Sequence, residues 1–302
     1  MADFVIIADS SCDANREIRE KYGIEYIANR FYYKDVEYFG DPDWECMPIK
    51  EFYDYIREGN RIFTSQISST GCEELFEKHI KEGKDVLCLT CPAVLSATAE
   101  VAKHTASKMQ AKYPDRKAIA IDTTTCSGGL IILAIMASKL RAEGKGVEEV
   151  AKEIEHHKKF INQEGSVESL SYLKRAGRVS GAAAFFGNLF NVKPMIISDI
   201  HGYNVAVEKV KGRKNSLIRA VERVAETYDR NGFKDIYITN ADCEEEAKMV
   251  KSLLMEKLNL TENEVHICTL NAVMGASVGP GMIGIYCYGK EITYDSKEGK
   301  NA

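Results

Sequence analysis

In the first half of the chain, short runs of apolar residues alternate with longer amphipathic stretches. The apolar runs are FVIIAD at residues 4–9, DVLCLT at 85–90 and KAIAID at 117–122. Continuous apolar runs separated by helical stretches are typical of parallel strands in a sheet that helices cover on both faces. We therefore predict an α/β fold that begins with a parallel sheet flanked by helices.

A helix is predicted after each of these strands, at residues 10–23, 95–113 and 130–144. The first helix begins with hydroxyl and acidic residues, and we expect it to end at Gly23 because glycine commonly terminates helices. The second is expected to bury the apolar residues along one of its faces. These residues are Leu95, Ala99, Ala102, Ala106 and Met109.

The second half has a different pattern, in which strand-like pieces and glycines are interspersed with helical stretches. The strand-like pieces include VKPMIIS, YNVAVEKV, DIYITNA, EVHICTL and MIGIYCY. This mixture predicts an α+β domain with a mixed or antiparallel sheet. The polar stretch near residues 155–170 is the expected boundary, which gives an N-terminal domain at 1–160 and a C-terminal domain at 161–302.

Short hydroxyl and acidic side chains follow each predicted strand of the first half. They occur at residues 9–11, 92–96 and 122–125. Many of them are expected to cap the next helix. Parallel sheets also bind ligands at the carboxyl ends of their strands, so the same positions are candidates for a binding site.

The composition narrows the classes of partner. The chain has 302 residues, a net charge of −5 and 45% hydrophobic residues. A negative net charge argues against nucleic acid, because phosphate binding needs a basic face. No apolar run approaches the roughly 18 residues that a membrane span needs, and the apolar start of the chain favours a strand over a signal peptide. We expect a cytoplasmic protein without stable membrane insertion.

Cysteines and histidines give no support for a metal centre or a cofactor. Nine cysteines are scattered along the chain, and Cys88 and Cys91 form one CxxC pair without a second pair nearby. Two reduced thiols beside a core strand are the simplest interpretation, and a redox role for this pair is the alternative. The sequence contains neither HxxxH nor HExxH. We therefore predict no metal and no cofactor.

The stretch RIFTSQISST at residues 61–70 places five hydroxyl side chains within seven positions and has no histidine, aspartate or lysine. Hydroxyls without a base are poor nucleophiles, so they suit holding a ligand better than attacking it. They are Thr64, Ser65, Ser68, Ser69 and Thr70.

Two motifs overlap at residues 275–284. The spacing of Gly279, Gly281 and Gly284 fits GxGxxG, but the strand-like IGIYCY follows where a dinucleotide site needs a helix. Ser277 fits GxSxG, the nucleophile turn of α/β hydrolases. In those enzymes the histidine follows the serine, whereas the last histidine here is His266. An acyl hydrolase that uses Ser277 is the alternative function.

Residues 171–196 combine basic and small side chains in an unusual way. Lys174, Arg175 and Arg178 surround Gly177, and a run of small residues follows at 181–184. Small residues permit close approach of another backbone or of a chain-like ligand. Tight helix packing in the core is the other interpretation.

Six of these segments resemble, in the same order, the motifs of the DegV family of bacterial fatty-acid-binding proteins. The similarity extends over nearly the whole chain. The segments are IIADSSCD, FTSQIS, LSATAEVA, IDTTTCSGG, YLKRAGRVSGAAAFFGNLFNVKPMI and GASVGPGMIG.

This resemblance implies a non-enzymatic protein that holds a long-chain fatty acid in a tunnel between its two domains. It implies that Thr64 and Ser96 of the N-terminal domain bind the carboxyl group, and that the C-terminal domain forms the tunnel. It also implies a partner, the catalytic subunit of a fatty-acid kinase, which converts the carboxyl group to an acyl phosphate. The tunnel walls are expected at Ala182, Ala183, Phe185, Phe186, Leu189 and Phe190.

The chain departs from the family pattern at positions that concern the head group and the partner. Ser277 stands where the family usually has a histidine, which keeps a hydrogen-bond donor and removes a cation. We expect Ser277 to be a third contact of the carboxyl group. Contact with the kinase is expected at Arg178 and Lys211, and Lys211 replaces a common arginine. A binder of another hydrophobic small molecule remains an alternative.

Overall fold

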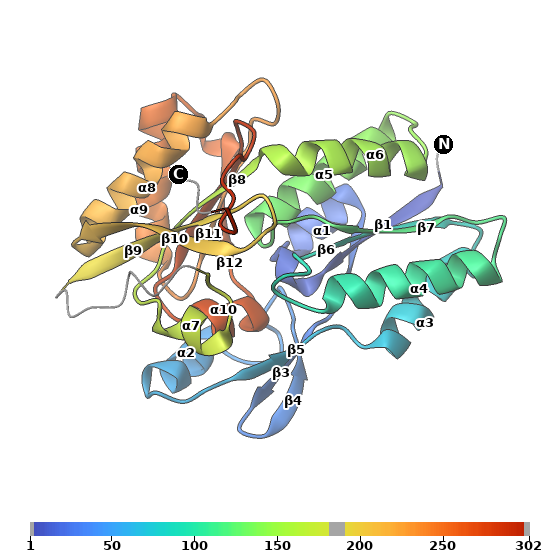
Figure 1. The fold of residues 1–302 in the computed structure, drawn as a ribbon, viewed down its shortest axis with the longest axis horizontal. Helices are drawn as coiled ribbons and strands as arrows, with labels where there is room; N and C mark the ends of the chain where they lie inside the picture. Colours follow the sequence, from blue (N-terminus) through green and yellow to red (C-terminus); the bar gives the residue numbers. More distant parts are fainter. Residues whose placement is uncertain (1–2, 181–190, 299–302) are drawn as a thin grey trace.

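The computed structural model describes residues 3–180 and 191–298. Three sheets are formed by these residues, and Figure 1 shows the two larger ones at opposite ends of the molecule. Sheet A is parallel with the strand order β2-β1-β6-β7, as the apolar runs predicted. Its strands are β1 (Phe4–Asp9), β2 (Ile24–Ile27), β6 (Asp85–Thr90) and β7 (Ala118–Asp122).

Helices cover both faces of sheet A. Alternate residues of β1 point to opposite faces, so that Ile6 packs in one hydrophobic cluster and Ile7 in another. The cluster around Ile6 is completed by α1 (Arg16–Tyr22), α5 (Gly128–Ala142) and α6 (Val147–His157). The cluster around Ile7 is completed by α3 (Ser69–Lys81) and α4 (Thr98–Lys112).

The ends of two helices test the sequence predictions closely. Helix α1 ends at Gly23, whose φ of 58° closes the helix in the left-handed region as predicted. Helix α4 begins at Thr98, so the prediction that Leu95 lies on its buried face is wrong. Leu95 lies instead in a turn closed by its backbone N–H and the carbonyl of Pro92, and its side chain is partly exposed.

Helix α5 is apolar on all sides because it is enclosed by two sheets. It contacts β1 and β6 of sheet A and also β11 and β13 of sheet C. Gly128 allows this close approach, since a Cβ atom there would lie 2.5 Å from the ring of Tyr286.

Sheet C is mixed, as predicted for the second half. Its order is β10-β9-β8-β13-β11-β12, and only the β11–β12 pair is parallel. Helices α8 (Arg213–Thr227) and α9 (Glu244–Leu258) pack on it through a third hydrophobic cluster. The strands are β8 (Ile161–Ser166), β9 (Val192–Ser198), β10 (Asn204–Lys211), β11 (Ile236–Asn240), β12 (Val265–Thr269) and β13 (Ile283–Tyr288).

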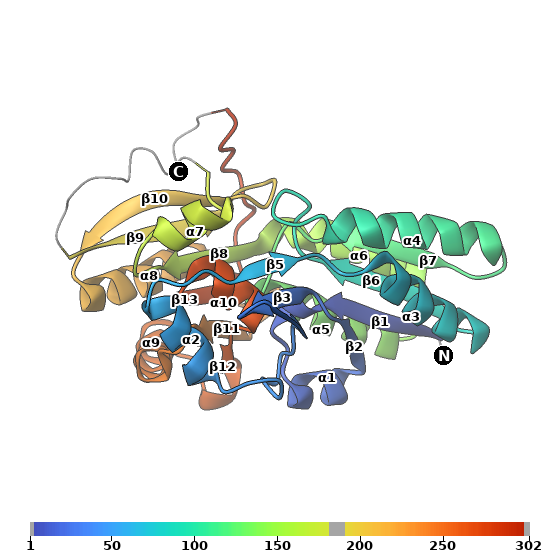
Figure 2. The same ribbon diagram turned by 90° about the horizontal axis from the view of Figure 1, so that it is seen from below.

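A small antiparallel sheet, sheet B, was not predicted from the sequence. It consists of β3 (Arg30–Tyr33), β4 (Val36–Phe39) and β5 (Phe63–Ser65) in the order β4-β3-β5. Figure 2 shows it beside the three short helices α2 (Ile49–Arg57), α7 (Ser171–Ala176) and α10 (Ala272–Val278).

A further hydrophobic cluster, beneath sheet B, also contains residues from both halves of the chain. Phe31 and Phe52 from the first half pack there with Leu173 and Val278 from the second. The indole N–H of Trp44 also donates to the carbonyl of Leu270 at 3.0 Å. Among the helices of residues 3–180 and 191–298, none is both long and apolar enough to cross a membrane.

Candidate functional site

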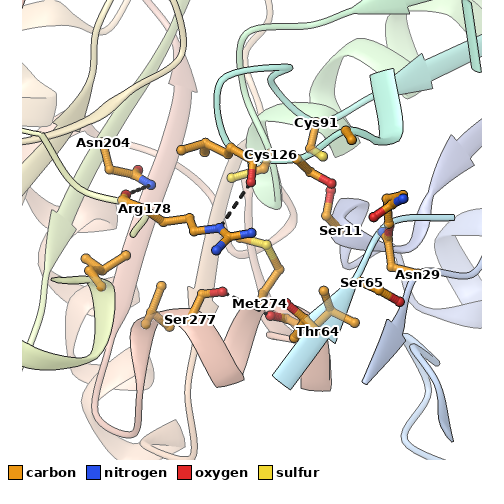
Figure 3. Close-up of a pocket in the computed structure, with 17 residues that line it drawn as sticks. Ser11, Asn29, Thr64, Ser65, Cys91, Cys126, Arg178, Asn204, Met274 and Ser277 are labelled. Carbon is orange, nitrogen blue, oxygen red and sulfur yellow. Dashed lines mark hydrogen bonds between the residues drawn. The ribbon is translucent and has the colours of Figure 1, made fainter. Parts of the chain in front are cut away.

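A pocket of about 110 Å³ lies where sheets A and B and helix α10 meet, and residues from both halves of the chain line it (Figure 3). The described lining contains five side-chain hydroxyl groups and one charged residue, Arg178, and it has no carboxylate and no histidine. We call it the head-group pocket. Its described lining is Ser11, Asn29, Thr64, Ser65, Gln66, Cys91, Leu95, Ser96, Ala97, Cys126, Leu173, Arg178, Asn204, Val273, Met274, Ser277 and Val278.

The three residues expected to bind a carboxyl group line this pocket together. Thr64 lies on β5, Ser96 in the turn before α4, and Ser277 in the last turn of α10. Their hydroxyls come from positions far apart in the sequence, so the fold and not the local motif brings them together. Their role in binding stays a prediction.

Ser96 belongs to a chain of hydrogen bonds that begins at the end of β1. The carboxylate of Asp9 accepts from the Asn29 amide at 3.0 Å, and Asn29 in turn accepts from the Thr98 hydroxyl at 2.8 Å. Because Thr98 has one hydroxyl proton, Ser96 must be the donor in its 3.0 Å contact with that hydroxyl. Ser96 would therefore have to redirect its proton in order to donate to a ligand.

Asp9 and Asp13 are structural groups of the site and do not line the pocket. Asp9 accepts from the backbone N–H groups of Ser11 and Cys91, at 2.8 and 2.6 Å, and so joins the ends of β1 and β6. This agrees with the capping role expected for acids after strands.

Asp13 accepts from the backbone N–H of Asn271 at 2.7 Å, and this hydrogen bond connects the two halves of the chain. Burial raises the pKa of the Asp13 carboxyl to about 8.

Thr64 is placed by sheet B, in which it pairs with Phe31 of β3. Its hydroxyl has no hydrogen-bond partner among residues 3–180 and 191–298, so its proton is available to a ligand. Ser277 contrasts with it, because its hydroxyl donates to the carbonyl of Val273 at 3.4 Å within α10.

The surroundings of Ser277 differ from those of a hydrolase nucleophile. Ser277 lies inside helix α10, whereas the nucleophile turn connects a strand to a following helix. His266 lies on β12 and stacks on Tyr237 with ring centroids 4.8 Å apart. The segment after Ser277 leads into strand β13, so the GxGxxG spacing also lacks the helix that a dinucleotide site needs.

Arg178 lies in the head-group pocket and points its guanidinium toward the hydroxyl groups (Figure 3). Gly177, with a φ of 71°, ends α7 and turns the chain so that Arg178 faces the pocket. The Arg178 Nε donates to the carbonyl of Leu95 at 3.1 Å, and the guanidinium also donates to the carbonyl of Ala176. Its charge is not paired with any carboxylate of the described residues.

Apolar side chains complete the pocket, and none of them was predicted from the sequence to line a binding site. Val273, Met274 and Val278 project from α10 beside Ser277. Met274 and Val278 are four residues apart, which places them on one face of a helix, and this spacing was the signal that could have found them. Leu95 and Leu173 face them from the other elements. The expected tunnel-wall residues Ala182, Ala183, Phe185, Phe186, Leu189 and Phe190 lie outside the described residues.

Lys211, the second expected contact with a kinase, is far from the pocket. It is exposed at the end of β10, seven residues from the pocket residue Asn204. At about 3.3 Å per residue, this separation is roughly 20 Å. The structure therefore does not bring Arg178 and Lys211 together.

The CxxC pair has the properties of buried thiols. Cys88 and Cys91 are both free and buried, and burial raises the pKa of each thiol well above its usual value. A thiol with a raised pKa is a poor nucleophile. Within the described part of the chain, no group of three or more histidine, cysteine, aspartate or glutamate residues is placed to hold a metal ion.

Comparison with known proteins identifies the family of this chain. The model of a family described as an uncharacterised protein family, DegV, matches residues 3–290. A DegV domain-containing protein of Clostridium perfringens is 30% identical over 298 residues, which cover 99% of this chain and 100% of that protein.

Solved structures of similar proteins share the fold. A DegV family protein from Thermus thermophilus, described as binding fatty acid, is 27% identical with a TM-score of 0.82, over 95% of this chain and 100% of that one. DegV from Bacillus subtilis, described as a fatty acid binding protein, is 25% identical with a TM-score of 0.78 over the same shares. The family model spans almost the whole sequence, and so this chain belongs to the DegV family.

Proposed function

We propose that this protein is a cytoplasmic, non-enzymatic carrier of a long-chain fatty acid that presents the carboxyl group to the catalytic subunit of a fatty-acid kinase. The observation that carries the proposal is the head-group pocket, whose described lining combines one unpaired guanidinium, several hydroxyls and apolar side chains and contains no acid. The fatty acids described for the related proteins of Thermus thermophilus and Bacillus subtilis support the same ligand class.

The head group is proposed to bind as a carboxylate. Arg178 supplies the positive charge, and Thr64, Ser96 and Ser277 supply hydrogen-bond donors at the same pocket. Hydrogen bonds to a charged group are stronger than those between neutral groups, and a guanidinium matches the two oxygens of a carboxylate. Arg178 thus supplies a cation at the pocket although serine stands at position 277.

The acyl chain is proposed to supply most of the affinity. Burial of about 15 methylene groups at roughly 0.8 kcal/mol each gives a gross driving force on the order of 12 kcal/mol. Near the head group the wall is formed by the apolar residues of α10 and by Leu173. We propose that the residues between 181 and 190 named above continue this wall.

The absence of a base from the described lining supports carriage over hydrolysis. A serine nucleophile needs a neighbouring group that accepts its proton. Ser277 donates only to a backbone carbonyl of its own helix among the described residues, and His266 is engaged with Tyr237 on sheet C. The hydrolase alternative therefore has no observation in its favour.

Native mass spectrometry of the purified protein tests the proposal directly. We expect the protein to carry co-purified acyl chains, and the delipidated protein to bind one long-chain fatty acid in a titration. A protein that is empty after purification and fails to take up fatty acid would contradict the proposal. Transfer of phosphate from ATP to the bound acid by a fatty-acid kinase tests the presentation step separately.

Removing single hydroxyls should weaken fatty-acid binding moderately and unequally. We expect Thr64→Val to lower the affinity about three- to tenfold, because the Thr64 proton is free to reach the ligand. Ser96→Ala should cost only about two- to threefold, since Ser96 must first give up its bond to Thr98. Isothermal titration with palmitate measures both effects.

Ser107→Ala is the matched control for these two variants. Ser107 is exposed on α4, and its hydroxyl donates only to the carbonyl of Lys103. The affinity of the Ser107→Ala variant for palmitate should equal that of the unaltered protein. A larger loss for Ser96→Ala than for Thr64→Val would show that the proton of Ser96 is not committed to Thr98.

A further inference from the structure

Ser11 lines the head-group pocket with a hydroxyl that has no hydrogen-bond partner among residues 3–180 and 191–298. The residue is almost completely buried, with 2% of its surface exposed. The Cys91 thiol lies beside the hydroxyl, but a thiol is only a weak hydrogen-bond partner. A buried hydroxyl without a partner lowers stability, and such groups are uncommon in folded proteins. A hydroxyl of this kind at the wall of a binding pocket indicates a contact with the ligand.

Two backbone hydrogen bonds fix the position of Ser11 just beyond the carboxyl end of β1. Its N–H donates to the Asp9 carboxylate at 2.8 Å, and its carbonyl accepts from the Ser127 N–H at 2.7 Å. Figure 3 shows Ser11 beside Cys91, on a different wall of the pocket from Ser277. Since the backbone on both sides is held in place, the hydroxyl can turn toward a ligand without a rearrangement of the chain.

Most other hydroxyls of the pocket are less free to donate. The hydroxyls of Ser96 and Ser277 already donate to other groups of the protein. Ser65 follows Thr64 on β5, so its side chain points to the opposite face of sheet B. Thr64 and Ser11 are therefore the two hydroxyls of the described lining whose protons are available at the pocket.

We propose that the Ser11 hydroxyl donates a hydrogen bond to the carboxylate of the bound fatty acid. This inference rests on the proposed function. A carboxylate accepts about four hydrogen bonds, of which a guanidinium can supply two. Arg178, Thr64 and Ser11 together then satisfy the head group. The hydrogen bond from Ser96 to Thr98 need not break, which makes Ser11 a stronger contact of the ligand than Ser96.

The substitution Ser11→Ala should weaken palmitate binding about three- to tenfold, because it removes a donor to a charged group. This loss should exceed the two- to threefold loss expected for Ser96→Ala. Isothermal titration of the delipidated proteins measures both affinities.

The stability of the same variant should not fall along with its affinity. Alanine removes a buried hydroxyl that has no partner in the described structure, so the free energy of unfolding of the delipidated variant should be unchanged or higher. Urea unfolding measures this quantity. A loss of affinity without a loss of stability distinguishes a ligand contact from a residue that only supports the fold.

Thr105→Val is the matched control. Thr105 is also buried, its hydroxyl also has no hydrogen-bond partner in the described structure, and it also lies beside a thiol, that of Cys72. It belongs to α4 and does not line the head-group pocket. The variant should therefore bind palmitate as the unaltered protein does, with a stability that is unchanged or higher.

The ionisation of the bound acid shows whether Ser11 contacts the carboxylate itself. A hydrogen bond to the charged form lowers the pKa of a carboxyl group. The pKa of bound palmitate should therefore be higher in Ser11→Ala than in the unaltered protein, and it should not change in Thr105→Val. Carbon-13 NMR of carboxyl-labelled palmitate measures the shift.

Three results would overturn the inference. They are a Ser11→Ala protein that binds palmitate normally, one whose affinity and stability fall together, and one whose affinity falls while the pKa of the bound acid stays the same. If the unaltered protein fails to bind palmitate, the proposed function itself is wrong and the inference falls with it.

Discussion

The substitution Arg178→Gln should weaken binding of a long-chain fatty acid by about 10- to 100-fold, the largest loss expected from any single change in the head-group pocket. Arg178 is the one charged residue in the described lining of that pocket. Without it, a carboxylate would enter a partly buried site with only neutral donors, and an unpaired buried charge is costly. Glutamine is shorter than arginine but keeps a polar amide, and it removes the charge and the guanidinium geometry.

The response of different ligands shows whether the charge itself is responsible. The affinity for palmitate should fall by the full 10- to 100-fold. Hexadecanol, which has no charge, should bind the variant and the unaltered protein nearly equally. Arg178→Lys should restore part of the palmitate affinity, because lysine keeps the charge without the planar pair of donors. An equal loss for the acid and the alcohol would mean that Arg178 matters for its bonds to the Leu95 and Ala176 carbonyls, and hence for the shape of the turn.

The titration of the bound acid gives a second test. A guanidinium beside the carboxyl group favours its ionised form and should hold its pKa below that of the free acid. In Arg178→Gln the pKa of the bound acid should therefore rise. Carbon-13 NMR of carboxyl-labelled palmitate measures this shift, and an unchanged pKa would contradict the contact.

Much of this site could be predicted from the sequence, because parallel strands place their carboxyl ends at one edge. The hydroxyls that follow β1 and β6 converge there for this reason, and Ser96 lies where the pattern indicated. The tunnel residues between 181 and 190 stay predictions, as does the role of Lys211. Ser277 was predicted to contact the carboxyl group only because the segment that contains it resembles a family motif.

Other features depended on contacts between distant segments and gave little local signal. Sheet B has strands of three or four residues, too short to show an alternating pattern, yet it determines where Thr64 points. The orientation of Arg178 depends on the left-handed Gly177 and on a carbonyl of the Leu95 turn, 83 positions away. Leu95 itself was misplaced because a turn of irregular chain, closed by its backbone N–H and the carbonyl of Pro92, precedes the start of α4 at Thr98.

The second large effect concerns Asp13, which joins the two halves of the chain beside this site. Its carboxyl is buried, accepts from the Ser127 hydroxyl at 2.5 Å and from the Asn271 backbone N–H at 2.7 Å, and has a pKa raised by burial to about 8. In the unfolded chain the same carboxyl titrates at about 3.9. At pH values between these two pKa values, the Asp13 carboxyl is ionised in the unfolded state and protonated in the folded state.

The sign of the pH effect follows from this difference. Since the folded state binds more protons from about pH 4 to pH 8, this carboxyl makes the free energy of unfolding fall as the pH rises through that range. Its contribution to the slope approaches about 1.4 kcal/mol per pH unit in the middle of the range. Asp13→Asn should abolish this contribution, because an amide resembles the protonated acid and does not titrate.

Asp13→Ala separates the hydrogen bonds from the charge. Asparagine can still accept from the Asn271 N–H and tolerates the positive φ of 55° at this position. Alanine leaves that buried N–H without its partner and is strained at the same φ, so we expect it to lower the free energy of unfolding at pH 7 by about 2–4 kcal/mol. Asparagine should lower it little or raise it.

Urea unfolding of the three proteins at several pH values measures these effects. Glu164, whose pKa burial raises to about 7, contributes to the slope of every variant and cancels in the difference between them. An Asp13→Asn protein that keeps the full slope of the unaltered protein would show that Asp13 is ionised in the folded state. In that case an ionised Asp13, bound by the Asn271 N–H and the Ser127 hydroxyl, would connect the two halves. Protonation of Asp13 at low pH would then weaken this connection. If the slope is lost as expected, the contact between the halves is made by a neutral acid, and rising pH should loosen the two sides of the head-group pocket.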